Sequence, residues 1–254
     1  NLIIFMKSKS IMFLFSIFSV SVLLSLADAT YGNMASDLAD KGNYAITEIN
    51  HNSQQPTNTA TDIDGNIYKV VTIGTQVWMA ENLRTTRYND GTPIPLVTDH
   101  AEWSRLTTPG YSWFQNDSLA YGITYGAKYN WHAVNTGRLC PAGWRVATDA
   151  DWTTLITYLG GQRVAGGRLK PSGATPTGSP QGSALDNTGF NAQLSGMRGG
   201  HGSFIYFGNY GKWWTSTRYD REFAWFRDMS ATDNIVGRNY ERKHFGFSVR
   251  CVQR

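Results

Sequence analysis

The stretch LCPAGWRVATDADWTTLITYLGG, residues 139–161, decides the fold because it contains the clearest helix of the chain. Thr148 is suited to cap the start of this helix, and Asp151, three residues later, completes a capping box. Gly160 and Gly161 mark its end. One apolar stripe at helical spacing comprises Trp152, Leu155, Ile156 and Leu159. The pattern predicts a helix over 148–161 that packs one face on a core.

The segments on either side predict further short elements. YGAKYNWHAVNTG, residues 125–137, favours a second and weaker helix. DIDGNIYKVVTIGTQVWMAENL, residues 62–83, alternates Gly-containing turns with β-branched and aromatic runs, which is typical of a hairpin. Residues 162–200 are rich in Gly, Pro, Ser and Thr and predict a long irregular excursion with few strands. Short strands are expected around 211–216, 223–229 and 245–252.

The start of the expected hairpin imitates a calcium-binding loop. Asp62, Asp64 and Asn66 have the spacing of the first three ligands of such a loop. Gly65, however, does not stand at the sixth position, and Ile73 occupies the place of the bidentate glutamate. The segment is therefore interpreted as a turn.

The first residues indicate export. An apolar run at 11–26 follows two lysines and is followed by Ala-Asp-Ala at 27–29, which is the pattern of a secretory signal peptide over 1–29. Residues 1–5 lie before Met6, a candidate start, and are open to being translated upstream sequence. An uncleaved anchor is the alternative. No later segment is long and apolar, so no transmembrane segment is expected after cleavage.

The remainder divides into a spacer and one domain. Residues 30–60 are poor in bulky apolar groups and predict a flexible spacer, and residues 61–254 form the expected folded domain. A chain of 254 residues with 41% hydrophobic and 17% charged residues suits one medium domain. The formal charge of +4 is a mild excess without a dense basic run, so a nucleic-acid partner is not expected.

The chain contains two cysteines, Cys140 and Cys251. In an exported protein a disulfide is the default interpretation, and the rival is a pair of separate reactive thiols. Closing a loop of about 110 residues would stabilise the fold by ~4–5 kcal/mol in the chain-entropy model.

Several ordered phrases resemble a known bacterial family. They are DGNIYKVVTIGTQVWMAENLRTTRYNDGTPIP, YGAKYNWHAV, LCPAGWRVATDADWTTL, YGKWWTST and GFSVRCV. Together they are similar to the Fibrobacter succinogenes major paralogous domain, found in exported and surface proteins, over roughly residues 61–253. GWRVATDADW and GFSVRCV also resemble the helix start and the ending of the formylglycine-generating-enzyme group.

The second resemblance implies an α+β, C-type-lectin-like fold with two helices, short antiparallel strands and long irregular loops. In such a fold the disulfide would tie the last strand to the segment that enters the helix at Thr148. Phe247, Val249 and Cys251 would then alternate onto the buried face, leaving Ser248 and Arg250 on the other.

The sequence gives no support for catalysis. The formylglycine-generating enzymes need a pair of copper-binding cysteines, and this chain has none to spare, because both of its cysteines match structural positions. His51, His100, His132, His201 and His244 are isolated and form no zinc motif. The short calcium motifs of sugar-binding C-type lectins are missing as well. No enzyme activity, metal or cofactor is therefore expected.

The stretch YGKWWTSTRYDREFAWF, residues 210–226, is crowded with aromatic and charged groups. At least one of Trp213 and Trp214 is expected in the core, whereas residues 218–222 lack an apolar period and are expected in water. Tyr and Arg are typical of recognition surfaces. The candidate ligand contacts are Arg218, Tyr219, Asp220, Arg221, Phe223, Asp233, Asn234, Arg238 and Tyr240.

The leading hypothesis is an exported, non-enzymatic module that binds a protein or glycan at or outside the cell surface. This face also resembles the ligand face of retroelement-diversified variable proteins of lectin-like fold. The alternatives are a structural envelope component without a discrete ligand and a degenerate relative of the formylglycine-generating oxidases. The pattern leaves open the ligand, the oligomeric state, and the choice between periplasm, cell surface and medium.

Overall fold

The computed structural model describes residues 59–172 and 187–254. The expected signal peptide and residues 30–58 of the expected spacer lie outside the described residues. The first strand begins at Thr59 and pairs through Ala60 with Tyr68, so the last two residues of the expected spacer belong to a sheet. No helix within the described ranges is both long and apolar enough to cross a membrane.

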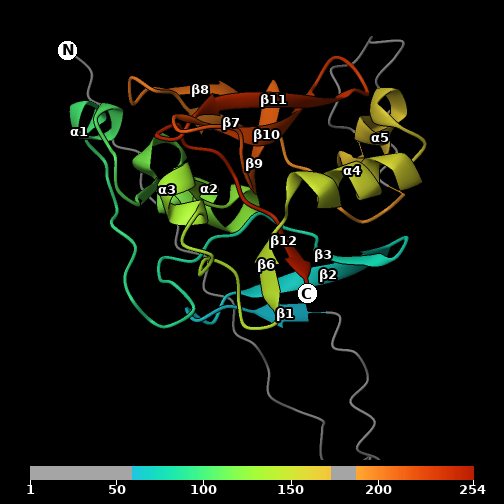
Figure 1. Cartoon of the computed structure of the whole chain (residues 1–254), viewed down its shortest axis with the longest axis horizontal. Coiled ribbons are helices and arrows are strands. Elements are labelled where there is room, and N and C mark those ends of the chain that lie inside the picture. Colours follow the sequence, from blue (N-terminus) through green and yellow to red (C-terminus); the bar gives the residue numbers. More distant parts are fainter. Residues whose placement is uncertain (1–58, 173–186) are drawn as a thin grey trace, which may run out of the picture. The chain divides into compact units, whose positions relative to one another are not determined.

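The described chain is a mixture of helices and strands in which strands predominate (Figure 1). The helical elements are α1 (His100–Ser104), the single 3-10 turn η1 (Phe114–Asn116), α2 (Ser118–Tyr125), α3 (Trp131–Val134), α4 (Asp149–Tyr158) and α5 (Gln162–Leu169). The strands are β1 (Thr59–Thr61), β2 (Ile67–Ile73), β3 (Gln76–Met79), β4 (Tyr111–Ser112), β5 (Lys128–Tyr129), β6 (Trp144–Val146), β7 (Ser195–Arg198), β8 (Phe204–Phe207), β9 (Tyr210–Arg218), β10 (Phe223–Ser230), β11 (Val236–Arg242) and β12 (Cys251–Gln253).

Two five-stranded sheets organise these elements, with orders β1-β2-β3-β12-β6 and β11-β10-β9-β7-β8. The pairing is antiparallel except between β7 and β9. The terminal strand β12 lies inside the first sheet, with Val252 opposite Trp78 of β3 and Arg145 of β6. The last strand is therefore adjacent to the hairpin of β2 and β3.

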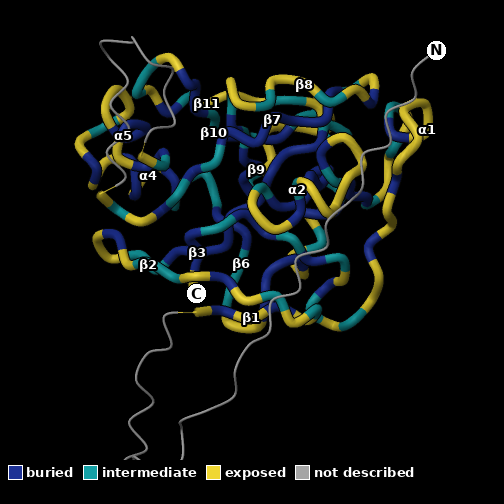
Figure 2. Tube along the Cα trace, turned by 180° about the vertical axis from the view of Figure 1, so that it is seen from behind, coloured by how far each residue is buried: buried dark blue, intermediate teal, exposed yellow. Residues whose placement is uncertain are grey.

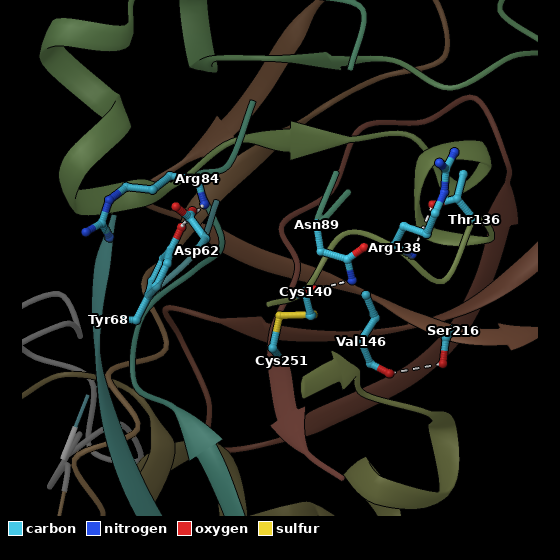
Figure 3. Close-up of a disulfide and its surroundings, with 10 residues drawn as sticks. All are labelled: Asp62, Tyr68, Arg84, Asn89, Thr136, Arg138, Cys140, Val146, Ser216 and Cys251. Carbon is cyan, nitrogen blue, oxygen red and sulfur yellow. Dashed lines mark hydrogen bonds between the residues drawn. A yellow bond between two sulfur atoms is a disulfide. The ribbon is translucent and has the colours of Figure 1, made fainter. Parts of the chain in front are cut away.

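The turn that opens this hairpin is held by one carboxylate. Asp62 Oδ1 accepts the backbone N–H groups of Asp64 and Asn66 at 3.0 and 2.9 Å, and Asp62 Oδ2 accepts the hydroxyl of Tyr68 at 2.6 Å (Figure 3). The interpretation as a turn is confirmed, because these bonds occupy the carboxylate that a calcium loop would use.

Helix α4 follows the sequence prediction closely. Thr148 Oγ1 accepts the N–H of Asp151 at 3.1 Å, and Asp151 Oδ2 accepts the N–H of Thr148 at 2.7 Å, so the capping box is confirmed. The four residues of the predicted stripe are buried. The second predicted helix is correct only in its last part: α3 is a single turn, because residues 125–130 complete α2 and form β5.

The prediction for residues 162–200 is wrong at its start, where the helix α5 forms, whereas the strand β7 near its end agrees with the few strands expected. Helix α5 contains Gly166 and Gly167 in its interior, which local propensity disfavours by about 1 kcal/mol each. Both glycines face Asn234, and a Cβ on Gly166 would come within 2.7 Å of the Asn234 carbonyl oxygen. Tertiary packing thus requires two residues that look like helix breakers in the sequence.

The interior contains two hydrophobic clusters. Figure 2 shows the buried parts of the chain in dark blue. Phe247, Val249 and Cys251 lie in the first cluster, as predicted for one face of the final segment. The opposite face is also buried: Ser248 and Arg250 are fully inaccessible to solvent. Because both faces of this segment are interior, its polar side chains must find partners inside the protein.

These partners form a set that we call the interior polar layer. It consists of Asn82, Lys128, Ser195, Trp213, Ser248 and Arg250. Arg250 donates to Asn82 Oδ1 and to the carbonyl oxygens of three residues, Met79, Phe190 and Asn191, at 2.6–2.9 Å. Lys128 Nζ donates to the hydroxyls of Ser195 and Ser248 at 2.6 and 2.8 Å. Burial lowers the pKa of Lys128 to about 7.

A disulfide between Cys140 and Cys251 joins the segment before β6 to β12, with the two Cα atoms 6.0 Å apart (Figure 3). Asn89 Nδ2 donates to the carbonyl oxygen of Cys140 at 3.0 Å, and Ser216 Oγ donates to that of Val146 at 3.1 Å. The predicted pairing is confirmed, and the alternative of two separate thiols is wrong.

Candidate ligand-binding face

Strand pairing brings four aromatic side chains together at one end of the second sheet. Trp225 of β10 lies opposite Tyr240 of β11, and Tyr219 follows β9 at the turn into β10. Tyr219 and Tyr240 are stacked with ring centroids 4.1 Å apart and an interplanar angle of 4°. Trp225 meets both tyrosines edge-on at 5.0 and 5.8 Å, and Phe223 meets Tyr240 at 5.7 Å. We call Tyr219, Phe223, Trp225 and Tyr240 the aromatic platform.

The platform remains accessible although its strand is largely buried. Tyr219 and Tyr240 are 45% and 49% exposed, and Trp225 and Phe223 are half-buried. Further along the same strand face, Met229 opposite Val236 is buried in the cluster that includes α4 and α5 residues. The platform is thus the part of this face that the helices leave uncovered.

Asp149, at the start of α4, lies between the part of this strand face that the helices cover and the part that they leave exposed. This carboxylate accepts the buried Arg227 at 2.8 Å and the exposed Arg238 at 2.9 Å. The guanidinium of Arg238 also lies 3.5 Å from the centroid of the Trp225 ring, so the ion pair fixes a cation over the platform. Burial lowers the pKa of Arg227, and the adjacent Asp149 raises it in part.

Two of the predicted contacts hold the β9–β10 turn. Asp220 Oδ1 accepts the N–H groups of Glu222 and Phe223, both at 2.8 Å. Arg218 Nε donates to the Asp220 carbonyl oxygen at 2.6 Å. These bonds fix the loop that carries Tyr219. Arg218 and Asp220 therefore position the platform, and their polar groups have intramolecular partners.

Arg221 lies on the same turn and lines a hollow beside the platform. This hollow, of about 310 Å³, is formed by Leu106, Thr107, His132, Arg221, Glu222, Arg242, Lys243 and His244. We call it the basic hollow. Its histidines are far apart in the sequence and gave no signal of a joint site.

The grouping of Asp233 and Asn234 with the other candidates is wrong. Asn234 precedes β11 by two residues and Tyr240 lies near its other end, so extended backbone separates them by roughly 20 Å. Asp233 Oδ1 accepts the N–H of Ile235 at 2.8 Å, and the Asn234 carbonyl accepts the N–H of Gly166 at 2.9 Å. Both residues line a different depression beside α5.

The structure thus defines a mixed helix and sheet domain with one exposed aromatic and arginine-rich end. The chain matches the family model of the Fibrobacter succinogenes major domain over residues 71–253, and it belongs to this family. Neither the curated proteins nor the solved structures contain a match to the chain. No group of three or more potential metal-ligating His, Cys, Asp or Glu residues occurs in the part that the structure describes.

Proposed function

We propose that this domain is an exported, non-enzymatic binding module of C-type-lectin-like fold that holds a protein or glycan ligand on the aromatic platform. The observation that carries the proposal is the stacked pair Tyr219–Tyr240, which is half exposed and framed by Trp225. Single exposed tyrosines are common on protein surfaces, whereas a contiguous group of exposed aromatic rings is typical of a surface that meets a partner.

The composition and rigidity of the face support recognition. Tyrosine and tryptophan supply large contact areas with few rotatable bonds, so a ligand would lose little side-chain entropy on these residues. Arg238 is already oriented by Asp149, and Arg221 lies at the adjoining edge. A ligand would meet an apolar surface with oriented polar groups at its rim, as in protein recognition sites.

The chemistry of the domain supports a role without catalysis. Cys140 and Cys251 are joined in the disulfide, so neither thiol is available to bind copper as in the formylglycine-generating oxidases. A structural envelope role without a ligand is the second candidate, favoured by the family's occurrence in surface proteins. Variation of the 218–240 region among copies of the gene would extend the proposal to a retroelement-diversified protein, and sequencing the locus in a population tests this.

The test is a screen of purified residues 59–254 on glycan and envelope-protein arrays. Tyr240→Ala and Arg221→Ala should each weaken a detected ligand by about tenfold, in line with hot-spot side chains. Tyr158→Ala is the matched control, because Tyr158 is 64% exposed on α4 and lies outside the platform. Equal binding by wild type, Tyr240→Ala and Arg221→Ala would rule out this face. Cell fractionation tests the proposed export.

A further inference from the structure

The basic hollow has more cations than its own residues neutralise. Arg221, Arg242 and Lys243 are cationic side chains, and Glu222 is the carboxylate among the described residues that line the hollow. The Arg242–Glu222 pair is 3.9 Å long, and both side chains are more than half exposed, so this pair contributes little attraction. No side-chain hydrogen bond of Arg221 occurs among the described residues. Like charges repel, so this arrangement is favourable when an anion joins it.

Lys243 has a structural role that keeps its charge in the hollow. Its ammonium donates to the carbonyl oxygens of Asp220 and Arg221 at 2.9 and 2.6 Å and lies 4.9 Å from the Trp131 ring centroid. Burial, followed by the neighbouring Arg218, lowers the pKa of Lys243. Lys243 thus closes the turn that carries Arg221, and its charge contributes to the potential of the hollow, where the Asp220 carboxylate offsets it in part.

Two half-buried histidines line the same hollow. His132 comes from α3, and His244 follows β11 and packs against Gly200, where a Cβ would come within 2.8 Å of His244 Nε2. The described residues provide no hydrogen-bond partner for either imidazole. Burial lowers the pKa of both histidines; Lys243 and His244 lower that of His132 further. Around His244, Arg242 and His201 lower the pKa and Glu241 raises it.

Phe223 connects the hollow to the aromatic platform. Its ring meets Tyr240 on one side at 5.7 Å and lies 5.5 Å from the Arg242 guanidinium on the other. An apolar surface of stacked rings is therefore continuous with a cationic depression large enough for one charged substituent. A nucleic acid would instead need a row of cations along its phosphates, which this compact cluster does not supply.

We propose that the basic hollow binds the acidic substituent, a sulfate or carboxylate, of a glycan whose sugar rings lie on the aromatic platform. This inference rests on the proposed function and narrows its ligand to acidic polysaccharides. The guanidinium groups of Arg221 and Arg242 are suited to the oxyanion, because they donate forked, charge-assisted hydrogen bonds. The stacked tyrosines supply the apolar faces on which a sugar ring lies.

The experiment is calorimetric titration of residues 59–254 with dextran sulfate and with unmodified dextran of the same length, at about 150 mM salt, where long-range attraction is screened. Dextran sulfate should bind at least about tenfold more tightly than dextran, because charge-assisted bonds are the stronger class. The double variant Arg221→Gln/Arg242→Gln should lose that advantage, whereas Arg254→Gln, which removes one positive charge from an exposed arginine outside the hollow, should keep it. Equal losses in the double variant and Arg254→Gln would overturn the proposal in favour of a net-charge effect.

Tyr240→Ala tests ligand binding on the aromatic platform separately from binding of an acidic group in the basic hollow. Two results together support both the platform and the hollow. Tyr240→Ala loses binding to both dextrans, and the double variant no longer binds dextran sulfate more tightly than dextran. If Tyr240→Ala weakens both dextrans and the double variant changes neither, the platform stands and the acidic-glycan inference fails. The inference is also overturned if neither dextran binds. It is overturned in favour of an acidic peptide if polyglutamate binds as tightly as dextran sulfate.

A pH series provides a further readout. Because burial lowers both histidine pKa values below the ordinary 6.5, His132 and His244 are neutral at pH 7.5 and take up protons only as the pH is lowered beyond that ordinary value. Sulfate keeps its charge over this range, so dextran sulfate should bind several-fold more tightly at pH 5 than at pH 7.5. His132→Gln/His244→Gln should flatten the profile, and an unchanged slope in this variant would exclude the histidines from the site.

Discussion

The interior polar layer and the basic hollow are both rich in cationic side chains near aromatic rings, but they differ in what their cations contact. In the layer, Arg250 donates to one side-chain and three backbone oxygens, and Lys128 donates to two serine hydroxyls. In the hollow, Arg221 has no side-chain hydrogen bond among the described residues, and Arg242 has the Phe223 ring and a long, exposed contact with Glu222.

This difference distinguishes residues that stabilise the fold from residues available to a ligand. A buried guanidinium without acceptors would destabilise the folded state by several kcal/mol, so the final segment could evolve only together with its carbonyl partners. An exposed guanidinium carries no such requirement and can remain without a partner until a ligand arrives. The Arg and aromatic composition is similar in both regions, and burial determines the role.

The largest expected effect tests whether the layer alone retains β12. Replacing both cysteines in Cys140→Ala/Cys251→Ala should lower the free energy of unfolding by about 4–5 kcal/mol, because the oxidised chain closes a loop with a sequence separation of 111 residues. Urea unfolding of the variant and of the oxidised wild type measures the change. A loss below about 1 kcal/mol would mean that the polar layer and the sheet hold β12 without the disulfide.

The second prediction removes the central cation of the layer. Arg250→Met removes a donor from four buried acceptor oxygens, of which Asn82 Oδ1 keeps its bond from Trp213 Nε1, and the free energy of unfolding should fall by about 3–4 kcal/mol. Arg254→Met is the control, because Arg254 is exposed only four residues further on. Similar urea midpoints for the two variants would contradict the distinction between fold and ligand residues.

The third prediction concerns the pH dependence that Lys128 gives the layer. The pKa of Lys128 is about 7 in the folded protein and 10.5 in the unfolded chain, so the unfolded chain binds more protons between these values. Stability should therefore rise with pH across this window, by about 3 kcal/mol between pH 7 and 9.5. Below pH 7 the amine is protonated in both states, and the penalty for burying its charge is constant.

The variant Lys128→Met isolates this term from other titrations. The hydroxyls of Ser195 and Ser248 lie 3.1 Å apart and can bond to each other when the amine is removed. The stability of wild type relative to Lys128→Met, measured by urea unfolding, should increase from pH 7 to 9.5. A difference that is flat over this range would show that the lysine enters the layer with an ordinary pKa.

Elements of the fold that depend on residues close together in the sequence were predictable, and elements that depend on contacts between distant residues were not. Helix α4 was predictable because its capping box and apolar stripe lie within twelve residues, from Thr148 to Leu159. Helix α5 was not, because Gly166 and Gly167 are explained only by their contact with Asn234, far along the chain. The alternation of the final segment was predicted correctly, but the buried state of Ser248 and Arg250 required knowledge of the second cluster.

The candidate face shows the same limit. Composition was sufficient to select Tyr219, Arg221 and Tyr240, which lie on the platform or the hollow. It could not show that Asn234 lies beyond one end of β11 and Tyr240 near the other. Residues that are close in sequence lie far apart when an extended strand joins them. The isolated histidines of the hollow meet only through tertiary structure.

The smallest expected change in the free energy of unfolding gives the sharpest test of the difference between the interior polar layer and the basic hollow. Arg221→Gln/Arg242→Gln should change the free energy of unfolding by less than about 0.5 kcal/mol, because exposed charges without close partners contribute little to folding. Removing like charges beside Lys243 should even stabilise the turn slightly at low salt. Urea unfolding at low and at about 500 mM salt measures both terms.

Arg221→Gln/Arg242→Gln tests ligand binding well because it should weaken the affinity for dextran sulfate without changing the free energy of unfolding. If stability is unchanged while binding of dextran sulfate is lost, the two arginines serve recognition alone. A loss of stability comparable to that of Arg250→Met would instead place Arg221 and Arg242 among the residues that hold the turn, together with Lys243 and its bonds to the Asp220 and Arg221 carbonyls. The surface would then differ from the interior only in exposure and not in role.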